Sequence, residues 1–332
     1  AALAPKQSAQ YWDGRLWCQR PTAFQDSLTW SFGLPFNGAG HAKACRVALH
    51  NVGLSQWDIV DMDFNRKIAI ITGAGHGIGA ALAREFAARG ARVAVADLNE
   101  TAAKSVAQEI GGIAFRCDAT LEGDIQALVA LVEAELGPVD IFFSNAGICL
   151  GEPDHAASAP NSTWQACWDV HVMAHVYATR AVLPGMIGRG DGYLVQMASA
   201  AGVLNQIGDA AYSTTKHAAV GFSEALSITH GDQGIKVSVA CPQYVATSML
   251  GYDEPTQASS VPSVLNPTVL AQRVADAMEV ETFMILPHPD VADYMIFKAS
   301  HYKKWLGAMR KLRAKIIMKL GRTKLAEMHK LI

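Results

Sequence analysis

Short apolar runs rich in β-branched and aromatic residues alternate with longer segments of helical periodicity from residue 65 onward. The runs predict strands, with helices between them, over residues 67–72, 92–97, 112–118, 139–145, 192–199, 236–242 and 283–287. Strands that alternate with helices are typical of βαβ units, and strands that are apolar on both faces lie in sheets covered on both sides. The pattern therefore predicts an α/β fold, a doubly wound parallel sheet in a single domain over residues 62–290.

Residues 1–61 depart from this pattern. They hold four of the seven tryptophans and no glutamate, and they show neither helical nor strand periodicity. The stretch "MDFNRKIAIITG" from Met62 looks like a natural start that leads straight into a strand. Residues 1–61 are interpreted as a leader, a fusion remnant or translated upstream sequence. A genuine accessory segment is the less favoured alternative.

The C-terminal segment, residues 291–332, is strongly basic. From Lys298 onward it contains 11 lysines and arginines and a single acid, Glu327. Apolar residues repeat there at helical spacing, at Trp305, Met309, Leu312, Ile316 and Leu320. The segment is predicted to form a basic amphipathic helix, for which an oligomer contact or packing over the substrate site is favoured over docking on a membrane surface.

The overall composition is that of a globular protein. The 332 residues carry a formal net charge of −2 and are 50% hydrophobic, so a large core is available and nucleic-acid binding is not expected. The six cysteines form no C-x-x-C pair, which is typical of free thiols in a reducing compartment. The sequence predicts neither a transmembrane helix nor a secretory signal, and the expected location is the cytoplasm.

A glycine-rich turn, "TGAGHGIG" at residues 72–79, follows the first predicted strand and opens a helix. Backbone without a Cβ atom can approach a pyrophosphate closely at a helix N-terminus. Asp97, at the end of the second strand, is placed to accept both hydroxyls of an adenosine ribose and to repel a 2′-phosphate. NAD is therefore expected over NADP, although His76 leaves some tolerance of NADP. A turn that serves packing alone is the less favoured alternative.

Tyr212 and Lys216 are four residues apart in a segment of helical character. Side chains at this spacing share one face of a helix, so an ammonium can stand beside a phenol. An adjacent cation stabilises a phenolate and lowers the phenol pKa from its usual value of about 10. A half-buried tyrosine beside a lysine without a chemical role is the common alternative, so the spacing alone does not establish a catalytic pair.

These motifs together resemble the short-chain dehydrogenase/reductase family. The match consists of Thr72-Gly73-x-x-x-Gly77-x-Gly79, Ser144-Asn145-Ala146-Gly147, Ser199, Tyr212 and Lys216. It spans about residues 63–287 and implies a Rossmann-like fold with seven strands in the order 3-2-1-4-5-6-7, NAD as cofactor, and assembly into a homodimer or homotetramer. It also implies cofactor contacts from Gly73, Gly75, His76, Gly77, Ile78, Gly79, Asp97, Asp118, Ala119, Asn145, Ala146, Gly147, Tyr212, Lys216, Pro242, Val245 and Thr247.

By this resemblance, Tyr212 is the acid or base that exchanges a proton with the substrate oxygen. Lys216 would lower its pKa and bind the nicotinamide ribose, while Ser199 would hold the substrate oxygen. Two positions depart from the family. His171 stands where an asparagine commonly anchors a water wire from the lysine, and a histidine there could hold water or shuttle a proton. Gln243 stands where a glycine is frequent and could reposition the turn on the cofactor side.

His171 and His175 also form an H-x-x-x-H pair, with Cys167 on the same stripe. Cys167 and His175 are separated by about 12 Å along a helix, too far to share one tetrahedral ion. No metal site is therefore expected.

The substrate side is predicted to be lipophilic. Contacts are expected from residues 148–150, Ala201, Val203, Leu204 and the segment after Thr247. No arginine or lysine is placed there to bind an anion, which favours a steroid-, terpenoid- or fatty-type secondary alcohol or ketone. The Pro- and Ser-rich residues 248–267 are expected to form a mobile lid. The predicted function is an NAD(H)-dependent oxidoreductase, and the alternative is a dinucleotide-binding sensor or scaffold without turnover.

Overall fold

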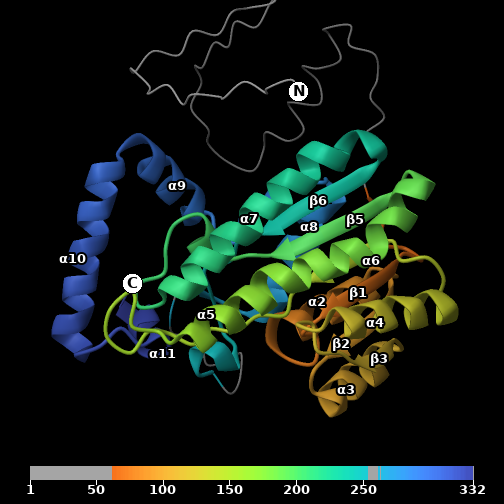
Figure 1. Ribbon diagram of the computed structural model, residues 1–332, viewed down its shortest axis with the longest axis horizontal. Helices are drawn as coiled ribbons and strands as arrows, with labels where there is room; N and C mark the ends of the chain where they lie inside the picture. The colour runs from red at the N-terminus through yellow and green to blue at the C-terminus, as the bar shows by residue number, and fades with distance from the viewer. Residues whose placement is uncertain (1–61, 253–260, 262, 332) are drawn as a thin grey trace, which may run out of the picture. The chain divides into compact units, whose positions relative to one another are not determined.

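The computed structural model describes residues 62–252, 261 and 263–331, which belong to one compact unit. The predicted N-terminal extension, residues 1–61, lies outside the described residues. Seven parallel strands form the central sheet in the order β3-β2-β1-β4-β5-β6-β9 (Figure 1). Their bounds are β1 Ile68–Thr72, β2 Arg92–Asp97, β3 Ile113–Arg116, β4 Ile141–Ser144, β5 Gly192–Met197, β6 Ile235–Ala240 and β9 Met284–Ile285. The predicted α/β class, strand number and strand order are confirmed.

Helices cover both faces of this sheet. On one face lie α2 (Gly77–Ala88), α3 (Glu100–Ile110) and α8 (Pro267–Glu279), and on the other α4 (Glu122–Glu135), α5 (Asn161–Trp168), α6 (Ala174–Arg189) and α7 (Ala210–His230). Adjacent strand residues alternate between the two layers, so Phe143 packs with α2 and α8 whereas Phe142 packs with α4 and α6. Burial of each such side chain contributes about 1.5–3 kcal/mol, which explains the apolar runs.

A second, two-stranded sheet was not predicted. It pairs two parallel strands: β7 (Tyr244–Val245), which precedes the segment expected to form a lid, and β8 (Val264–Leu265), which lies near the end of that segment. Within that segment a 3₁₀ turn covers Ser248–Leu250. Residues 253–260 and 262 lie outside the described residues, so a mobile lid stays a prediction.

The basic C-terminal segment forms two main helices, and the predicted apolar stripe from Trp305 to Leu320 lies entirely in the second. Helix α9 (Asp290–Ser300) ends at His301, and α10 (Tyr302–Leu320) follows directly, before the short α11 (Leu325–Met328) and a final 3₁₀ turn at His329–Leu331. The break occurs at His301, whose φ of −137° and ψ of 49° are not helical. Among the described helices, none is both long and apolar enough to cross a membrane.

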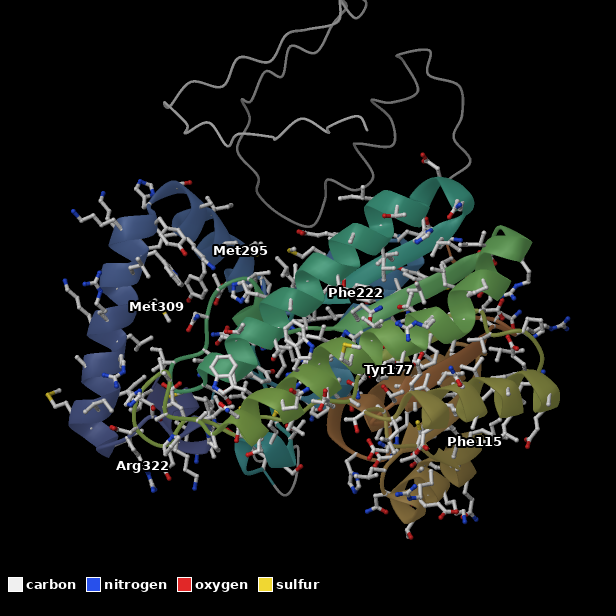
Figure 2. All side chains as sticks on the ribbon, viewed as in Figure 1. Phe115, Tyr177, Phe222, Met295, Met309 and Arg322 are labelled. Atoms are coloured by element: carbon white, nitrogen blue, oxygen red, sulfur yellow. The ribbon has the colours of Figure 1, made fainter. Side chains whose placement is uncertain are left out.

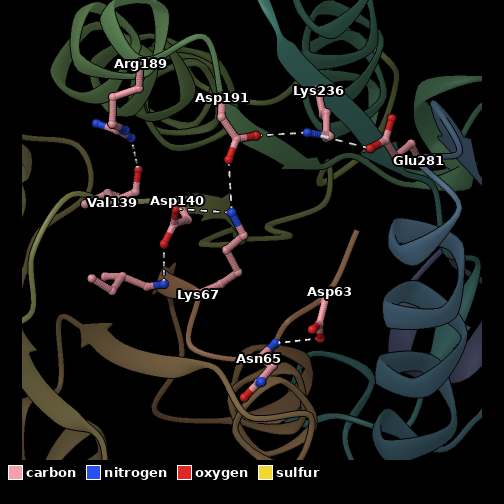
Figure 3. A network of polar contacts seen from close by, with 10 residues as sticks. Asp63, Asn65, Lys67, Val139, Asp140, Arg189, Asp191, Lys236 and Glu281 are labelled. Carbon is pink, nitrogen blue, oxygen red and sulfur yellow. Dashed lines mark hydrogen bonds and ion pairs between the residues drawn. The ribbon is translucent and has the colours of Figure 1, made fainter. Parts of the chain in front are cut away.

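Ion pairs fasten the amino ends of the central strands together (Figure 3). Lys67, just before β1, lies 3.0 Å from a carboxylate oxygen of Asp191, just before β5, and Lys236 in β6 lies 2.9 Å from the other oxygen. Asp140 accepts the Ile68 backbone N–H at 2.8 Å. This edge of the sheet is therefore closed by side chains, and the opposite edge, where the strands end, holds the main cavity.

Candidate active site

A cavity of about 640 Å³ opens at the carboxyl ends of β1, β2, β4, β5 and β6. Parallel α/β sheets bind ligands at this edge because the helix N-termini point there. The cavity brings together most of the residues predicted from the sequence, namely Gly73, His76, Gly77, Ile78, Gly79, Asp97, Asp118, Ala119, Asn145, Ala146, Gly147, Ser199, Tyr212, Lys216, Pro242, Val245 and Thr247. Of the predicted set, Gly75 and His171 are not in its lining.

The glycine turn is packed against the end of β4. A Cβ atom on Gly79 would lie 2.2 Å from the Gly73 carbonyl oxygen, and Gly73 itself has a φ of +62°. Asn145 holds the turn, since its side-chain amide donates to the Thr72 and Gly73 carbonyls at 2.9 and 3.1 Å. These contacts require glycine at both positions and fix the turn beneath the N-terminus of α2.

Asp97, at the end of β2, lines the cavity. One carboxylate oxygen accepts the Gly75 backbone N–H at 2.8 Å, and the other accepts the Asn99 N–H at 2.8 Å. Gly75 is therefore a support for Asp97 rather than a cavity residue. A carboxylate held here by backbone donors keeps lone pairs directed into the cavity, which suits the hydroxyls of a ribose.

Tyr212 stands at the start of α7 and is held by the helix cap. The Asp209 side chain accepts the Tyr212 backbone N–H at 3.0 Å, which fixes the first turn of the helix. Lys216, one turn later, is buried, donates to the Met197 carbonyl at 2.7 Å and lies 5.7 Å from the centre of the Tyr212 ring. Ser199, just after β5, lines the same cavity as Tyr212, and its hydroxyl oxygen accepts the Ala201 N–H at 3.1 Å. The three side chains predicted from the motif therefore meet at one wall of the cavity.

Burial is the main influence on the pKa values of Tyr212 and Lys216 in the chain without cofactor. Burial raises the pKa of Tyr212 well above its usual value, and the hydrogen bond from Ser199 lowers it by less than burial raises it. Burial likewise lowers the pKa of Lys216 to about 8. The lysine was expected to lower the phenol pKa, but the protein chain alone keeps Tyr212 protonated because desolvation outweighs the neighbouring cation.

His171 lies behind the cavity wall in a π-helical turn. Residues Asp169–Met173 form this turn between α5 and α6, and it directs the buried imidazole towards Gly147. Its Nε2 accepts the Ile148 N–H at 3.1 Å, so Nδ1 carries the proton and donates to the Thr215 hydroxyl at 2.9 Å. Burial lowers the pKa of His171 well below its usual value. The residue is thus a neutral support for the loop after β4 and for α7.

His175, one turn further on, has a different environment. It is buried on the face of α6 that meets the sheet, and neither of its ring nitrogens has a hydrogen-bond partner among the described residues. Unpartnered buried oxygens of Thr179, Ser144 and Gln196 belong to the same interface. Burial lowers the pKa of His175 to about 3.

This histidine gives the fold a specific sensitivity to acid. The unfolded chain takes up a proton at the usual histidine pKa of about 6.5, whereas folded His175 does not until about pH 3, so its stabilising effect is present above pH 6.5 and is lost as the pH falls. Between neutral pH and about pH 5 the native protein should lose about 2 kcal/mol more unfolding free energy than His175→Leu. Urea unfolding at both pH values measures this difference.

Thr179→Val is the matched control, because it removes a polar atom from the same interface without removing a titrating group. Its loss of stability on acidification should equal that of the native chain. An equal loss in His175→Leu would contradict the assignment of this sensitivity to His175.

Several cavity residues were not predicted from the sequence. Asp169 and Val170 come from the π-helical turn, Gln206 from the loop after β5, Tyr244 from β7 and Leu325 from α11. The π-helical turn brings Asp169 and Val170 to the cavity and the folded-back C-terminus brings Leu325, and neither feature has a periodic signature in the sequence.

The predicted substrate residues divide between two cavities. Ile148 lines the main cavity, while Cys149 and Leu150 line an adjoining cavity of about 730 Å³. Residues 201–204 line neither, and the carbonyls of Val203 and Leu204 instead accept hydrogen bonds from Lys298 at 2.7 and 2.9 Å.

The turn after β6 contains the second departure, Gln243. Its backbone N–H donates to His288 Nδ1 at 3.1 Å, and His288 Nε2 donates to the Tyr244 carbonyl at 3.0 Å. His288 therefore fastens the turn after β6, and Gln243 lines the cavity. In the part of the chain that the structure describes, no three His, Cys, Asp or Glu side chains are gathered as metal ligands.

Comparison with known proteins agrees with this geometry. Residues 67–258 match the family described as short chain dehydrogenase. Oxidoreductase UcpA of Salmonella typhimurium is 33% identical over 239 residues, which cover 69% of this chain and 90% of that protein. Epidermal retinol dehydrogenase 2 of Mus musculus is 30% identical over 231 residues, 67% of this chain and 74% of that protein.

Among solved structures, a short chain dehydrogenase/reductase from Burkholderia phymatum in complex with NAD superposes with a TM-score of 0.66 at 25% identity. The superposition covers 73% of this chain and 96% of that one. From the family match over residues 67–258 and these similarities, the chain belongs to the short chain dehydrogenase family, whose members are oxidoreductases acting on CH–OH groups.

Proposed function

We propose that the chain is an NAD(H)-dependent oxidoreductase that interconverts a secondary alcohol and a ketone on a lipophilic substrate. The observation that carries the proposal is the meeting of Ser199, Tyr212 and Lys216 at one wall of a cavity that also contains the glycine turn. A proton-transfer group and a dinucleotide site side by side are what hydride transfer to or from a carbinol carbon requires.

The residues present fit a nicotinamide dinucleotide. The glycine turn and the N-terminus of α2 would hold the pyrophosphate, Asp97 the adenosine ribose, and Asp118 and Ala119 the adenine side. Asn145, Lys216 and Thr247 would hold the nicotinamide half. When bound, the oxidised ring supplies a hydride acceptor and a positive charge close to the phenol.

The chain's own side chains would manage the proton. Ser199 is placed to donate a hydrogen bond to the substrate oxygen and to stabilise alkoxide character on it. Tyr212 would take the proton of that oxygen during oxidation and return it during reduction. Because burial makes the phenol less acidic in the chain alone, the Lys216 ammonium and the added positive charge must act together to bring its pKa down. His171 would act as a positioning residue, by holding the Ile148 N–H and Thr215 on either side of the site.

The lining of the main cavity supports a lipophilic substrate. Lys216 is the one lysine or arginine among the described residues that line it, and that side chain is engaged by Met197. The remaining wall on the substrate side is apolar, formed by Ile148, Val170, Met249, Leu250 and Leu325. An anionic group would find no cation there to offset the loss of its hydration, whereas a steroid-, terpenoid- or fatty-type alcohol would bury apolar area.

Asp97 is proposed to set the preference for NAD. Asp97→Asn keeps an acceptor for the Gly75 N–H but removes the charge, so it weakens the ribose contact and relieves repulsion of a 2′-phosphate. The ratio of kcat/KM with NAD to kcat/KM with NADP should fall at least about tenfold. Steady-state kinetics with both cofactors gives the ratio. Asp118→Asn, on the adenine side, is the control and should leave it within about twofold.

The proposed function is tested by a cofactor-reduction screen on the purified chain. Secondary alcohols of sterol, terpenoid and long-chain type are compared with polyols and hydroxy acids, by absorbance of NADH. The lipophilic alcohols should give at least about a tenfold higher kcat/KM. A preference for polyols or hydroxy acids would contradict the substrate class. NADH binding with no turnover of any alcohol or ketone would favour the sensor or scaffold instead.

A further inference from the structure

The positive charge of the chain is concentrated in its last helices. From Lys298 onward there are 11 lysines and arginines and one acid, whereas the preceding sequence has 17 against 29. Between Asp293 and Glu327 the sequence contains no acid at all. The near-neutral total charge is therefore the sum of an acidic N-terminal part and a strongly basic C-terminal part. Such a charge asymmetry is typical of a surface that binds an anionic partner.

The cations of α10 face away from the rest of the protein. The apolar stripe of the helix points inward, with Trp305 and Ile316 buried. Seven exposed cations on α10 have no acidic partner within the described residues, namely Lys303, Lys304, Arg310, Lys311, Arg313, Lys315 and Lys319. Figure 2 shows nitrogen-tipped side chains projecting outward along α10 at the edge of the molecule.

Large apolar side chains are exposed beside these cations. On α9 they are Tyr294, Ile296 and Phe297, and on α10 they are Tyr302, Leu306 and Met318. Ile296 is 64% exposed and Met318 is 79% exposed. Leu306 and Met318 are about 18 Å apart along the helix, so they form separate points rather than one patch for a complementary protein surface. Aliphatic side chains gain nothing from a nucleic-acid backbone, but they gain free energy at the boundary between lipid headgroups and acyl chains.

We propose that the α9–α10 helix pair docks on the surface of a membrane that contains anionic lipid. The exposed lysines and arginines would lie against the headgroups, and the exposed apolar side chains would enter the boundary region. The contact is peripheral and involves no membrane-spanning helix.

The α9–α10 helix pair lies next to the adjoining cavity, because Ile317 of α10 lines it. Lys298 fastens α9 to the loop after β5 through the Val203 and Leu204 carbonyls, and it stacks at 5.0 Å on the Trp305 ring of α10. The adjoining cavity of about 730 Å³ is lined by Ile317 of α10 and by Leu150, and it shares Met249 and Leu325 with the main cavity. A docked helix pair would thus bring these cavities close to lipid. The docking itself is independent of the proposed function.

Co-sedimentation of the full chain with vesicles tests the proposal. The protein should bind vesicles of phosphatidylcholine mixed with phosphatidylserine, should not bind phosphatidylcholine alone, and should be released by high salt. The triple variant Lys304→Gln, Lys311→Gln, Lys315→Gln should lower the partition coefficient at least about tenfold. The double variant Ile296→Ser, Met318→Ser should lower it on the mixed vesicles without altering its dependence on salt.

The matched control removes three exposed cations from the body of the protein, by Arg84→Gln, Lys104→Gln and Arg180→Gln. It should retain native binding, and circular dichroism should show all variants folded. An equal loss of binding in the tail and body triples would overturn the proposal, as would failure of the native chain to bind anionic vesicles. A change of oligomeric state in the tail triple without any vesicle binding would assign the surface to a second copy of the chain and would also overturn it.

Discussion

Tyr212→Phe is expected to lower kcat for alcohol oxidation by about 10³-fold or more while NAD binding stays within a few-fold of native. The hydroxyl is the one atom removed, and the ring, the helix cap at Asp209 and the neighbouring Lys216 all stay in place. Without it, the group proposed to take the proton is missing as the carbinol carbon gives up its hydride. Steady-state NADH formation and a separate binding titration measure the two quantities.

Ser199→Ala is the informative companion to Tyr212→Phe. It removes a donor to the substrate oxygen and also the hydrogen bond that lowers the pKa of Tyr212, so we expect a loss of about 10²-fold in kcat. The double variant should be little worse than Tyr212→Phe alone, because the two residues act on one oxygen. Full activity in Tyr212→Phe would contradict the proposal that Tyr212 exchanges the proton with the substrate oxygen.

Gly79→Ala should weaken NAD binding at least about 100-fold and also destabilise the fold. The new Cβ would lie 2.2 Å from the Gly73 carbonyl oxygen and 2.6 Å from the Asn145 amide nitrogen, both of which are part of the phosphate turn. The turn must therefore move away from the N-terminus of α2. Calorimetric titration with NAD, together with urea unfolding, measures both effects.

Gly221→Ala, in the middle of α7, is the matched control. Nothing lies within 4 Å of a Cβ placed there, so the change should leave NAD affinity at the native value. It should raise the unfolding free energy by about 0.5–1 kcal/mol, because alanine favours a helix interior over glycine. Native NAD affinity in Gly79→Ala would show that the turn does not hold the dinucleotide.

The sequence predicted the sheet and most of the cavity because both follow from local patterns. Strands such as β1 and β4 are continuous apolar runs, and the turn at residues 72–79 has its glycines at fixed positions after a strand. Since the carboxyl ends of parallel strands meet at one edge, residues as distant as Asp97 and Ser199 are predictable members of one site from the sequence alone.

Features that depend on long-range packing were not predictable. Leu325 reaches the cavity because the final turn of the chain is buried, where His329 accepts the Tyr252 hydroxyl at 2.9 Å, 77 residues away. The π-helical turn that places His171 has no recognisable spacing. The rise in the Tyr212 pKa that burial causes in the chain without cofactor was not predictable, because helical spacing reveals a neighbouring cation but not the degree of burial. Desolvation is a property of the whole fold.

The most direct test of the central claim is the pH dependence of kcat/KM for alcohol oxidation in the native chain and in Lys216→Met, which removes the ammonium beside the phenol. The account predicts one ionisation in the native profile, below the usual tyrosine pKa of about 10, and its displacement to higher pH in Lys216→Met. An identical profile in the two proteins, or no ionisation in the native one, would contradict the claim that Tyr212 exchanges the proton with the help of Lys216.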